Sequence, residues 1–334
     1  DMVQSRGLGD VYKRQNILHE KNMIQENATA ISLIDIYSSF AFLAIKNNYV
    51  KPKITKDRIL SIKKGRHPVV ESLLPSTEKF IPNDIEIDAN TNQIHLLTGP
   101  NMAGKSTYLR QLGLMVVMAQ IGCFVPAKKA SIGIVDKLFT RVGASDNLAG
   151  GESTFLVEMN EASNILNNAT DNSFILLDEV GRGTSTFDGL SLAWAITEHI
   201  HNTDGIRART IFATHYHELT ALEDNLTRLE NHHVEVKEFG DSIVFMRTIA
   251  RGSGDKSYGI QVAKMAGLPL KVVKRAEQIL EHYLGNDMVN RDETPDTSND
   301  QLVIFDDREQ LIKSKLKEID LDSMTPIEAM KYLD

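Results

Sequence analysis

Cysteine and tryptophan are nearly absent from this sequence of 334 residues, in which each occurs once. The single cysteine, Cys123, cannot form an internal disulfide, which excludes disulfide-rich secreted scaffolds and predicts a reducing, cytoplasmic environment. Positive charge is not in excess either, since 37 Lys and Arg stand against 45 Asp and Glu and give a net charge of −8. A surface covered with lysines and arginines that bind phosphates is therefore disfavoured, although a local basic groove is compatible with this net charge.

Long uninterrupted apolar runs are also lacking. The longest, Leu112–Val125, contains Gln120 and is shorter than the ~18–20 residues needed to span a bilayer, so we expect no membrane contact. Apolar residues make up 42% and charged residues 25%, which is close to an ordinary soluble protein. The length allows about two domains.

The N-terminal region divides into two parts. Residues 1–15 show neither a helical nor a strand period, and we expect them to be disordered or foreign to the native protein. From 16 to 47, apolar residues recur at three- and four-residue steps, which predicts a long amphipathic helix. Because the preceding sequence offers this helix no partner surface, we expect the chain to be the C-terminal part of a larger protein, with 16–50 ending a helical domain.

The central sequence alternates strand and helix patterns, which predicts an α/β fold with a mostly parallel central sheet flanked by helices. The expected strands are Asp84–Ile87, Gln93–Thr98, Lys137–Arg141, Phe174–Asp178 and Thr210–Ala213. The expected helices are Ser106–Ile121, Phe155–Ala169 and Leu190–Ile200. A hairpin over 232–249 and two helices within 257–283, divided by Gly267 and Pro269, complete a domain of residues 51–284. A linker and a helical tail are expected over 285–334.

A glycine-rich loop with a lysine follows the strand pattern that ends at Thr98. It matches G-x-x-x-x-G-K-[ST], whose backbone N–H groups and helix N-terminus cradle phosphates. The expected nucleotide contacts are Gly99, Pro100, Asn101, Met102, Ala103, Gly104, Lys105, Ser106 and Thr107. We expect Lys105 to bridge the β- and γ-phosphates of ATP and the Ser106 hydroxyl to bind Mg²⁺. The alternative is a glycine turn that merely joins a strand to a helix.

Two carboxylates end the apolar strand pattern at Phe174–Asp178. Asp178 is expected to bind Mg²⁺, and Glu179 to polarise the attacking water as a catalytic residue. Carboxylates that only solvate a strand end are the alternative. Similarly, His215 ends the next strand pattern, where it could sense the γ-phosphate or position the water, although a lone histidine there is more often structural.

Another glycine turn, Leu148-Ala-Gly-Gly-Glu-Ser153-Thr154, resembles the signature loop of ABC-type ATPases. In those enzymes this loop faces the nucleotide of the opposite subunit, which makes Ser153 and Thr154 candidate γ-phosphate contacts. An ordinary helix N-cap is the alternative.

Five motifs in one order carry a wider resemblance: T-G-P-N-M-x-G-K-S-T, F-T-R-V-G-A-S-D, E-S-T-F-L-V-E-M, D-E-x-G-R-G-T-S-T and F-A-T-H-Y-H-E-L. Together they resemble the MutS family of DNA mismatch-repair ATPases, over residues 16–334. The resemblance implies an ABC-type ATPase domain that uses ATP and Mg²⁺, with Lys105, Glu179 and His215 as catalytic residues. It also implies that Phe80 contacts the adenine, with Arg247 on the other side of the base where bacterial members carry a histidine; a phenylalanine of the apolar core is the alternative for Phe80.

The family's partners follow from the same resemblance. It implies a homodimer with composite ATPase sites, mismatched double-stranded DNA bound by N-terminal domains that this sequence does not contain, and a downstream repair factor such as MutL. Residues 16–50 resemble the end of the lever helices, and 257–283 resemble a helix-turn-helix that holds the partner subunit. The alternative is a non-catalytic, nucleotide-dependent dimerisation and DNA-tethering module of another ABC-type DNA-repair ATPase.

Overall fold

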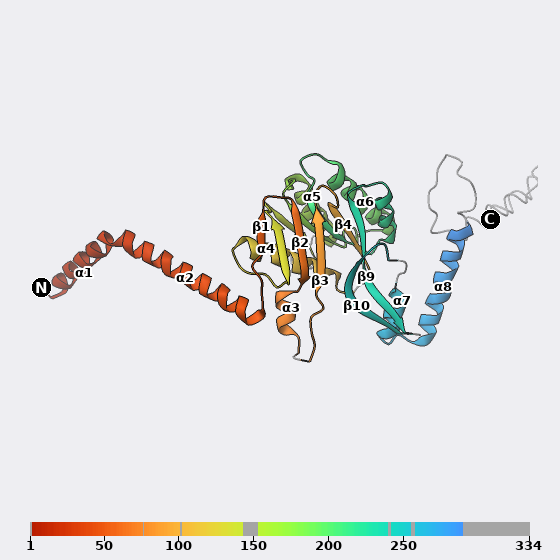
Figure 1. The fold of residues 1–334 in the computed structure, drawn as a ribbon, viewed down its shortest axis with the longest axis horizontal. Helices are drawn as coiled ribbons and strands as arrows, with labels where there is room; N and C mark the ends of the chain where they lie inside the picture. Colours follow the sequence, from red (N-terminus) through yellow and green to blue (C-terminus); the bar gives the residue numbers. More distant parts are fainter. Residues whose placement is uncertain are drawn as a thin grey trace, which may run out of the picture. The chain divides into compact units, whose positions relative to one another are not determined.

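The computed structural model of this chain describes residues 2–75, 77–100, 102–142, 153–239, 242–254 and 258–289. The chain forms two compact units, Asp1–Leu270 and Lys271–Asp334. The first unit holds two β-sheets and nearly all of the described helices (Figure 1).

A six-stranded sheet in the order β10-β9-β4-β8-β7-β6 forms the centre of the first unit. Its strands are β4 (Ile94–Thr98), β6 (Leu138–Arg141), β7 (Phe174–Asp178), β8 (Arg209–Ala213), β9 (Leu229–Phe239) and β10 (Ser242–Arg251). All neighbours run parallel except the β9–β10 hairpin. Every residue of β4, β7 and β8 is buried, as parallel strands covered on both faces require. The predicted fold class is confirmed.

A second sheet of four strands lies in the same unit, in the order β1-β5-β2-β3. Its strands are β1 (Lys53–Thr55), β2 (Ile59–Gly65), β3 (Asn83–Asp88) and β5 (Lys129–Gly133). The sequence patterns did not separate this sheet from the first. Between β2 and β3 lies a short helix that the sequence patterns did not predict, α3 (Pro68–Leu73), and its N-cap is His67. The ring nitrogen Nδ1 of His67 accepts hydrogen bonds from the backbone of Val69 and Val70, which provides the missing start signal.

Two apolar cores cover the two faces of the six-stranded sheet. Because neighbouring strand residues point to opposite faces, Leu97, Leu176 and Ile211 belong to one core and Leu96, Leu177 and Phe212 to the other. The first core also contains α4 (Lys105–Gln120) and the buried residues of β2, β3 and β5. The second contains residues of α5 (Thr154–Asn168), α6 (Thr186–Asn202) and the 3₁₀-helix η1 (His217–Asp224).

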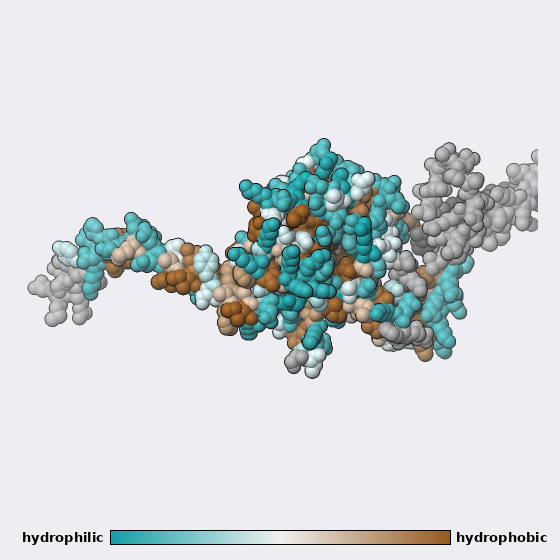
Figure 2. All heavy atoms as spheres, viewed as in Figure 1, coloured by the Kyte–Doolittle hydropathy of each residue, from teal (hydrophilic) through white to brown (hydrophobic). Residues whose placement is uncertain are grey.

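Two consecutive helices, α1 (Met2–His19) and α2 (Lys21–Asn47), form the N-terminal part. The predicted helix over 16–47 is confirmed, and residues 2–15, which show no helical period in the sequence, belong to α1. That stretch contains no proline, and weak helix formers alone do not end a helix. Only Ala44 of α2 is buried, and Figure 2 shows apolar surface along this helix. Among the described residues α2 is the one helix whose length and composition would allow it to cross a membrane. A helix that is covered by protein meets the same two criteria.

The two helices predicted within 257–283 are present as α7 (Gly259–Met265) and α8 (Leu270–Val289), and α8 lies almost wholly in the second unit. The end of α7 is a Schellman motif, in which Gly267 has φ +84°. The Leu268 N–H donates to the Ala263 carbonyl and the Gly267 N–H to that of Lys264. The glycine therefore ends α7 by adopting a left-handed conformation that other residues rarely take.

Arg209 on β8 connects the two sheets through backbone carbonyls. Its side chain is fully buried, and its two terminal nitrogens donate to the carbonyls of four residues at 3.0–3.3 Å, namely Ile59, Gly133, Ile134 and Asn172. Burial lowers the pKa of the guanidinium to about 10, so Arg209 stays charged at neutral pH. One buried side chain thus holds segments of both sheets together.

Arg209→Met should lower the free energy of unfolding by at least about 3 kcal/mol, because it leaves several buried carbonyls without donors. The matched control is Arg207→Met, whose side chain is 40% exposed and pairs with the exposed Asp204, a contact that contributes about 1 kcal/mol or less. Urea denaturation followed by circular dichroism measures both. Equal losses in the two variants would contradict the connecting role of Arg209.

Candidate functional site

The glycine-rich loop joins β4 to α4 in a conformation that needs its glycines. Gly99 has φ +140°, Met102 φ +74° and Gly104 φ +104°, all outside the region that most residues favour. Gly104 is the N-cap of α4, so the first turn of the helix opens directly onto the loop. Asn101 lies outside the described residues, and the exposed Met102 and buried Ala103 complete the turn. The backbone can therefore present N–H groups to an anion.

Lys105, the first residue of α4, is buried with 4% of its surface exposed. Its ammonium donates to the Gly99 carbonyl and lies 3.7 Å from Glu179 Oε1. Burial lowers the pKa of Lys105, whereas the charges of Glu179 and Asp178 raise it. The amine is thus held inside the loop by neighbouring carboxylates rather than by solvent.

Asp178 ends β7, and its carboxylate accepts a hydrogen bond from the Ser106 hydroxyl. Burial raises the pKa of Asp178, while the bond from Ser106 lowers it. Asp178 Oδ1 is buried without a hydrogen-bond partner. Mg²⁺ takes oxygen ligands, and an unpaired carboxylate oxygen beside a hydroxyl is a suitable donor set. The residues present therefore fit the predicted ion. Thr107, in the first turn of α4, is half-buried.

Glu179 adopts a left-handed backbone conformation with φ +53°, which is rare for residues other than glycine. Its N–H donates to the Ala213 carbonyl at 2.8 Å, which fixes this turn against the end of β8. Its carboxylate lies between two cations, with Arg182 Nη1 at 2.6 Å from Oε2 and Lys105 on the other oxygen. Such strained backbone is concentrated at functional sites.

His215 follows β8 and is exposed, with its ring tilted against that of Tyr216 at a centroid distance of 4.1 Å. Partial burial lowers its pKa, Glu179 raises it and Lys105 lowers it further. These charge effects place His215 in the same electrostatic environment as Lys105 and Glu179. The net lowering keeps the imidazole neutral at neutral pH, when it can accept a proton or hydrogen bond.

A buried clamp holds the segment just after Glu179, and sequence reasoning missed it. The Gly181 N–H donates to Glu158 Oε1, and the Gly181 carbonyl accepts from the Tyr216 hydroxyl at 3.0 Å. A side chain at Gly189 would lie 2.2 Å from the Gly181 carbonyl oxygen, so the close approach of α6 requires glycine there. Arg141 joins the clamp, with Nη2 3.5 Å from Glu158 Oε2. Glu158 and Arg141 lie in two of the quoted motifs, but no spacing in the sequence indicates that they meet.

The predicted signature residues begin α5. Ser153 is its N-cap by backbone conformation, but its hydroxyl makes no capping bond, and both Ser153 and Thr154 are exposed. The ordinary helix-cap alternative is thereby weakened. The loop before Ser153, residues 143–152, lies outside the described part of the chain.

Phe80 is half-buried and lines a cavity of about 370 Å³ together with Asn47, Asn48, Arg66, Glu71, Glu78 and Lys79. None of the described phosphate-loop residues lines this cavity. Asn83 connects this segment to Arg247, since its side-chain amide donates to the Arg247 carbonyl at 2.8 Å and accepts from the Ile249 N–H. Arg247 itself has φ +56°. The adenine contact of Phe80 remains a prediction.

Glu158→Ala should lower the free energy of unfolding by about 2–3 kcal/mol and slow any ATP hydrolysis, because the buried Gly181 N–H loses a charged acceptor. Glu161→Ala is the matched control. Glu161 contacts the same Arg141 at 2.9 Å but is 48% exposed, so its loss should change stability by about 1 kcal/mol or less. Urea denaturation and phosphate release measure the two effects. Unchanged ATP hydrolysis in Glu158→Ala would show that the clamp does not influence the site.

Comparison with known proteins agrees with these motifs. The family model of MutS domain V matches residues 95–283. The DNA mismatch repair protein MutS of Clostridium kluyveri is 51% identical over 331 residues, which cover 96% of this chain and 38% of the relative. MutS of Caldicellulosiruptor bescii is 48% identical and also covers 96% of this chain and 38% of the relative. MutS of Clostridium botulinum (strain Langeland) is 60% identical over 79% of this chain and 28% of the relative. This chain therefore spans little more than a third of the length of the first two relatives. Because the family model matches more than half of the chain, the chain belongs to the MutS family.

Proposed function

We propose that this chain is the ATP-binding and ATP-hydrolysing dimerisation module of a DNA mismatch-repair protein, in which nucleotide state is coupled to the binding of mismatched DNA. The observation that carries the proposal is the meeting of Lys105, Asp178 and Glu179 at the ends of β4 and β7. A lysine buried between carboxylates, beside a loop of backbone N–H groups, suits a polyphosphate and its metal ion. The names of the relatives add mismatch repair as the setting.

Each side chain has a distinct task in this proposal. Lys105 exchanges its contact with Glu179 for the β- and γ-phosphates, while the loop amides bind phosphate oxygens. Ser106 and Asp178 hold Mg²⁺, which when bound offsets the negative charge of the phosphates. Glu179, released from Lys105, orients the attacking water and accepts its proton. The neutral imidazole of His215 is available to hydrogen-bond near the γ-phosphate.

The site is completed by a second copy of the chain. Ser153 and Thr154 are both exposed, and the Ser153 hydroxyl makes no capping bond to α5, so both side chains are available to the nucleotide of a partner subunit. Closure of the dimer on ATP binding would be transmitted to DNA-binding domains through the helices at 16–50. The ATP site and the DNA site would thereby be coupled. Mismatched DNA, a downstream factor such as MutL and a cytoplasmic location belong to this proposal for the whole protein.

Lys105→Ala should weaken ATP binding by about 30- to 100-fold, because a buried charge-assisted contact contributes about 2–3 kcal/mol. The control is Lys128→Ala, which removes an exposed lysine far along the chain from the loop and should leave the affinity unchanged. Isothermal titration with Mg·ATP gives both dissociation constants. Unaltered affinity in Lys105→Ala would remove the assignment of the phosphate loop.

Glu179→Gln should bind Mg·ATP at least as tightly as the unmodified chain but hydrolyse it at least about 100-fold more slowly. The amide keeps the shape of the side chain but cannot accept a proton, and its neutrality relieves repulsion with the γ-phosphate. Phosphate release measures the rate, and light scattering with ATP, ADP or no nucleotide measures accumulation of a dimer. Hydrolysis at the unmodified rate would show that Glu179 does not orient the water. Slow hydrolysis by the unmodified chain itself, despite tight binding, would favour the non-catalytic alternative.

Mixing Glu179→Gln with the double variant Ser153→Ala, Thr154→Ala tests the composite geometry. In a heterodimer of the two, one site carries both changes and the other carries neither, so hydrolysis should recover to about half the rate of the unmodified dimer. Each variant alone is the control, and sizing of differently tagged chains confirms that heterodimers form. Heterodimers without recovery would contradict a signature loop that acts across the interface.

A further inference from the structure

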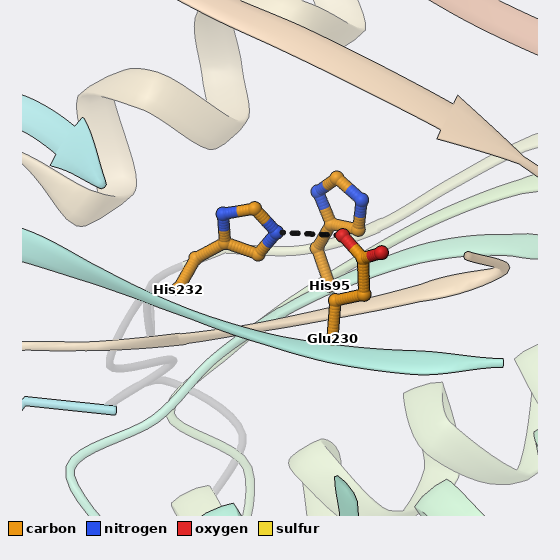
Figure 3. Close-up of side chains that lie close together, drawn as sticks. All are labelled: His95, Glu230 and His232. Atoms are coloured by element: carbon orange, nitrogen blue, oxygen red, sulfur yellow. Dashed lines mark ion pairs between the residues drawn. The ribbon is translucent and has the colours of Figure 1, made fainter. Parts of the chain in front are cut away.

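Three metal-ligating side chains meet on the central sheet, away from Ser106 and Asp178. His95 comes from β4, and Glu230 and His232 come from the neighbouring β9 (Figure 3). The parallel register pairs His95 with Glu230, and His232 is two residues further along the same strand. Because side chains alternate along strands, all three project from one face of the sheet. This is the face of Leu97, which packs in the core shared with the four-stranded sheet.

The donor atoms of these residues are close enough to share one ion. One ligand atom from each side chain lies within 4.8 Å of the others, and His232 Nε2 is 3.6 Å from Glu230 Oε2. The two imidazole rings stack at a centroid distance of 4.1 Å and an interplanar angle of 25°. A tetrahedral zinc ion needs its donors about 3.3 Å apart, so side-chain adjustments of about 1 Å would complete the geometry.

Two buried nitrogens in the cluster have no hydrogen-bond partner among the described residues. Only 5% of His95 is exposed, and its Nε2 makes no hydrogen bond, while its other ring nitrogen is hydrogen-bonded to the backbone of Glu86 on β3. Nε2 of His232 is likewise buried without a hydrogen bond. An unpaired buried polar atom costs about 1–3 kcal/mol, so native proteins seldom retain two side by side. A ring fixed by a backbone carbonyl with its free nitrogen turned inward is the usual arrangement of a metal-bound histidine.

The charge of this cluster comes from its one carboxylate, since the other two ligand groups are imidazoles. Glu230 supplies one negative charge. Its other oxygen is 3.1 Å from Arg251 Nη2, but the Arg251 side chain is 71% exposed and can move into solvent.

We propose that His95, Glu230 and His232 form a binding site for a transition-metal ion of the Zn²⁺ type. Two imidazoles and one carboxylate are a zinc donor set that leaves a fourth position for water. A purely structural histidine stack beside a Glu230–Arg251 ion pair is the simpler account, but it leaves both Nε2 atoms buried without a hydrogen bond. The site differs in chemistry from the all-oxygen pair of Ser106 and Asp178, which suits Mg²⁺.

The position of this site gives the ion a structural consequence. β4 leads from His95 directly into the phosphate loop at Gly99, and β9 follows it in parallel up to the pair Thr98–His233. The Thr98 hydroxyl also donates to the His232 carbonyl at 3.3 Å. An ion bound by both strands would therefore stabilise the base of the phosphate loop without contacting nucleotide.

Zinc binding by the untagged 334-residue chain, stripped of metal with a chelator and kept free of nucleotide, tests the proposal. Competition with a chromogenic chelator should give one Zn²⁺ per chain, unaffected by millimolar Mg²⁺, and Co²⁺ should produce the visible absorption of a tetrahedral site. His232→Gln should weaken Zn²⁺ binding by at least about 10- to 100-fold. The matched control is His199→Gln, on the exposed surface of α6, which should bind as the unmodified chain does.

Arg251→Gln supplies a second readout that does not depend on removing a ligand. It takes away a cation that competes for Glu230, so Zn²⁺ affinity should rise several-fold, whereas adventitious binding at surface histidines would not respond. Thermal melting checks that each variant is folded, and His232→Gln leaves the more deeply buried His95 in place. No Zn²⁺ binding by the unmodified chain, or equal affinity in the unmodified chain and folded His232→Gln, would overturn the proposal.

Discussion

The parallel pairing of β4, β8 and β7 is the constraint on which the rest of this molecule depends. The pairing continues past the strands, since the Thr214 N–H donates to the Leu97 carbonyl at 3.0 Å and the Glu179 N–H to the Ala213 carbonyl at 2.8 Å. These two bonds bring together the ends of three strands that are far apart in the sequence. Lys105, Glu179 and His215 belong to the loops and helix that start there, so their proximity follows from backbone hydrogen bonding.

Backbone strain at Glu179 is maintained by the packing around it. A left-handed residue in this position is unfavourable by about 1–3 kcal/mol unless the surroundings fix it. The bond to Ala213 fixes one side, and the clamp on Gly181 by Glu158 and Tyr216 fixes the other. The clamp reaches α5, the helix whose N-cap is Ser153. A change at the start of α5 is therefore mechanically connected to the carboxylate beside Lys105.

Buried polar groups also define the junction between the two sheets. Arg209 on β8 donates to four carbonyls. His95 on the neighbouring strand β4 is hydrogen-bonded to the backbone of β3, which belongs to the other sheet. Hydrogen bonds buried this deeply would be lost if the sheets shifted, so each of them specifies one position of one sheet against the other. Apolar packing alone, which is tolerant of small shifts, would specify that position less strictly.

Local spacing along the chain was enough to predict several helices and strands and the phosphate-binding chemistry. The alternation of apolar runs predicted β4, α4, β7, α6 and β8, and the glycine pattern predicted the phosphate loop, because period and turn geometry are local properties of the chain. It also named Lys105, Asp178 and Glu179. The tertiary structure alone decided the separation into two sheets, the clamp of Glu158 on Gly181 and the meeting of His95 with His232. Each of these joins residues more than twenty positions apart through side-chain burial and strand register, which no spacing in the sequence encodes.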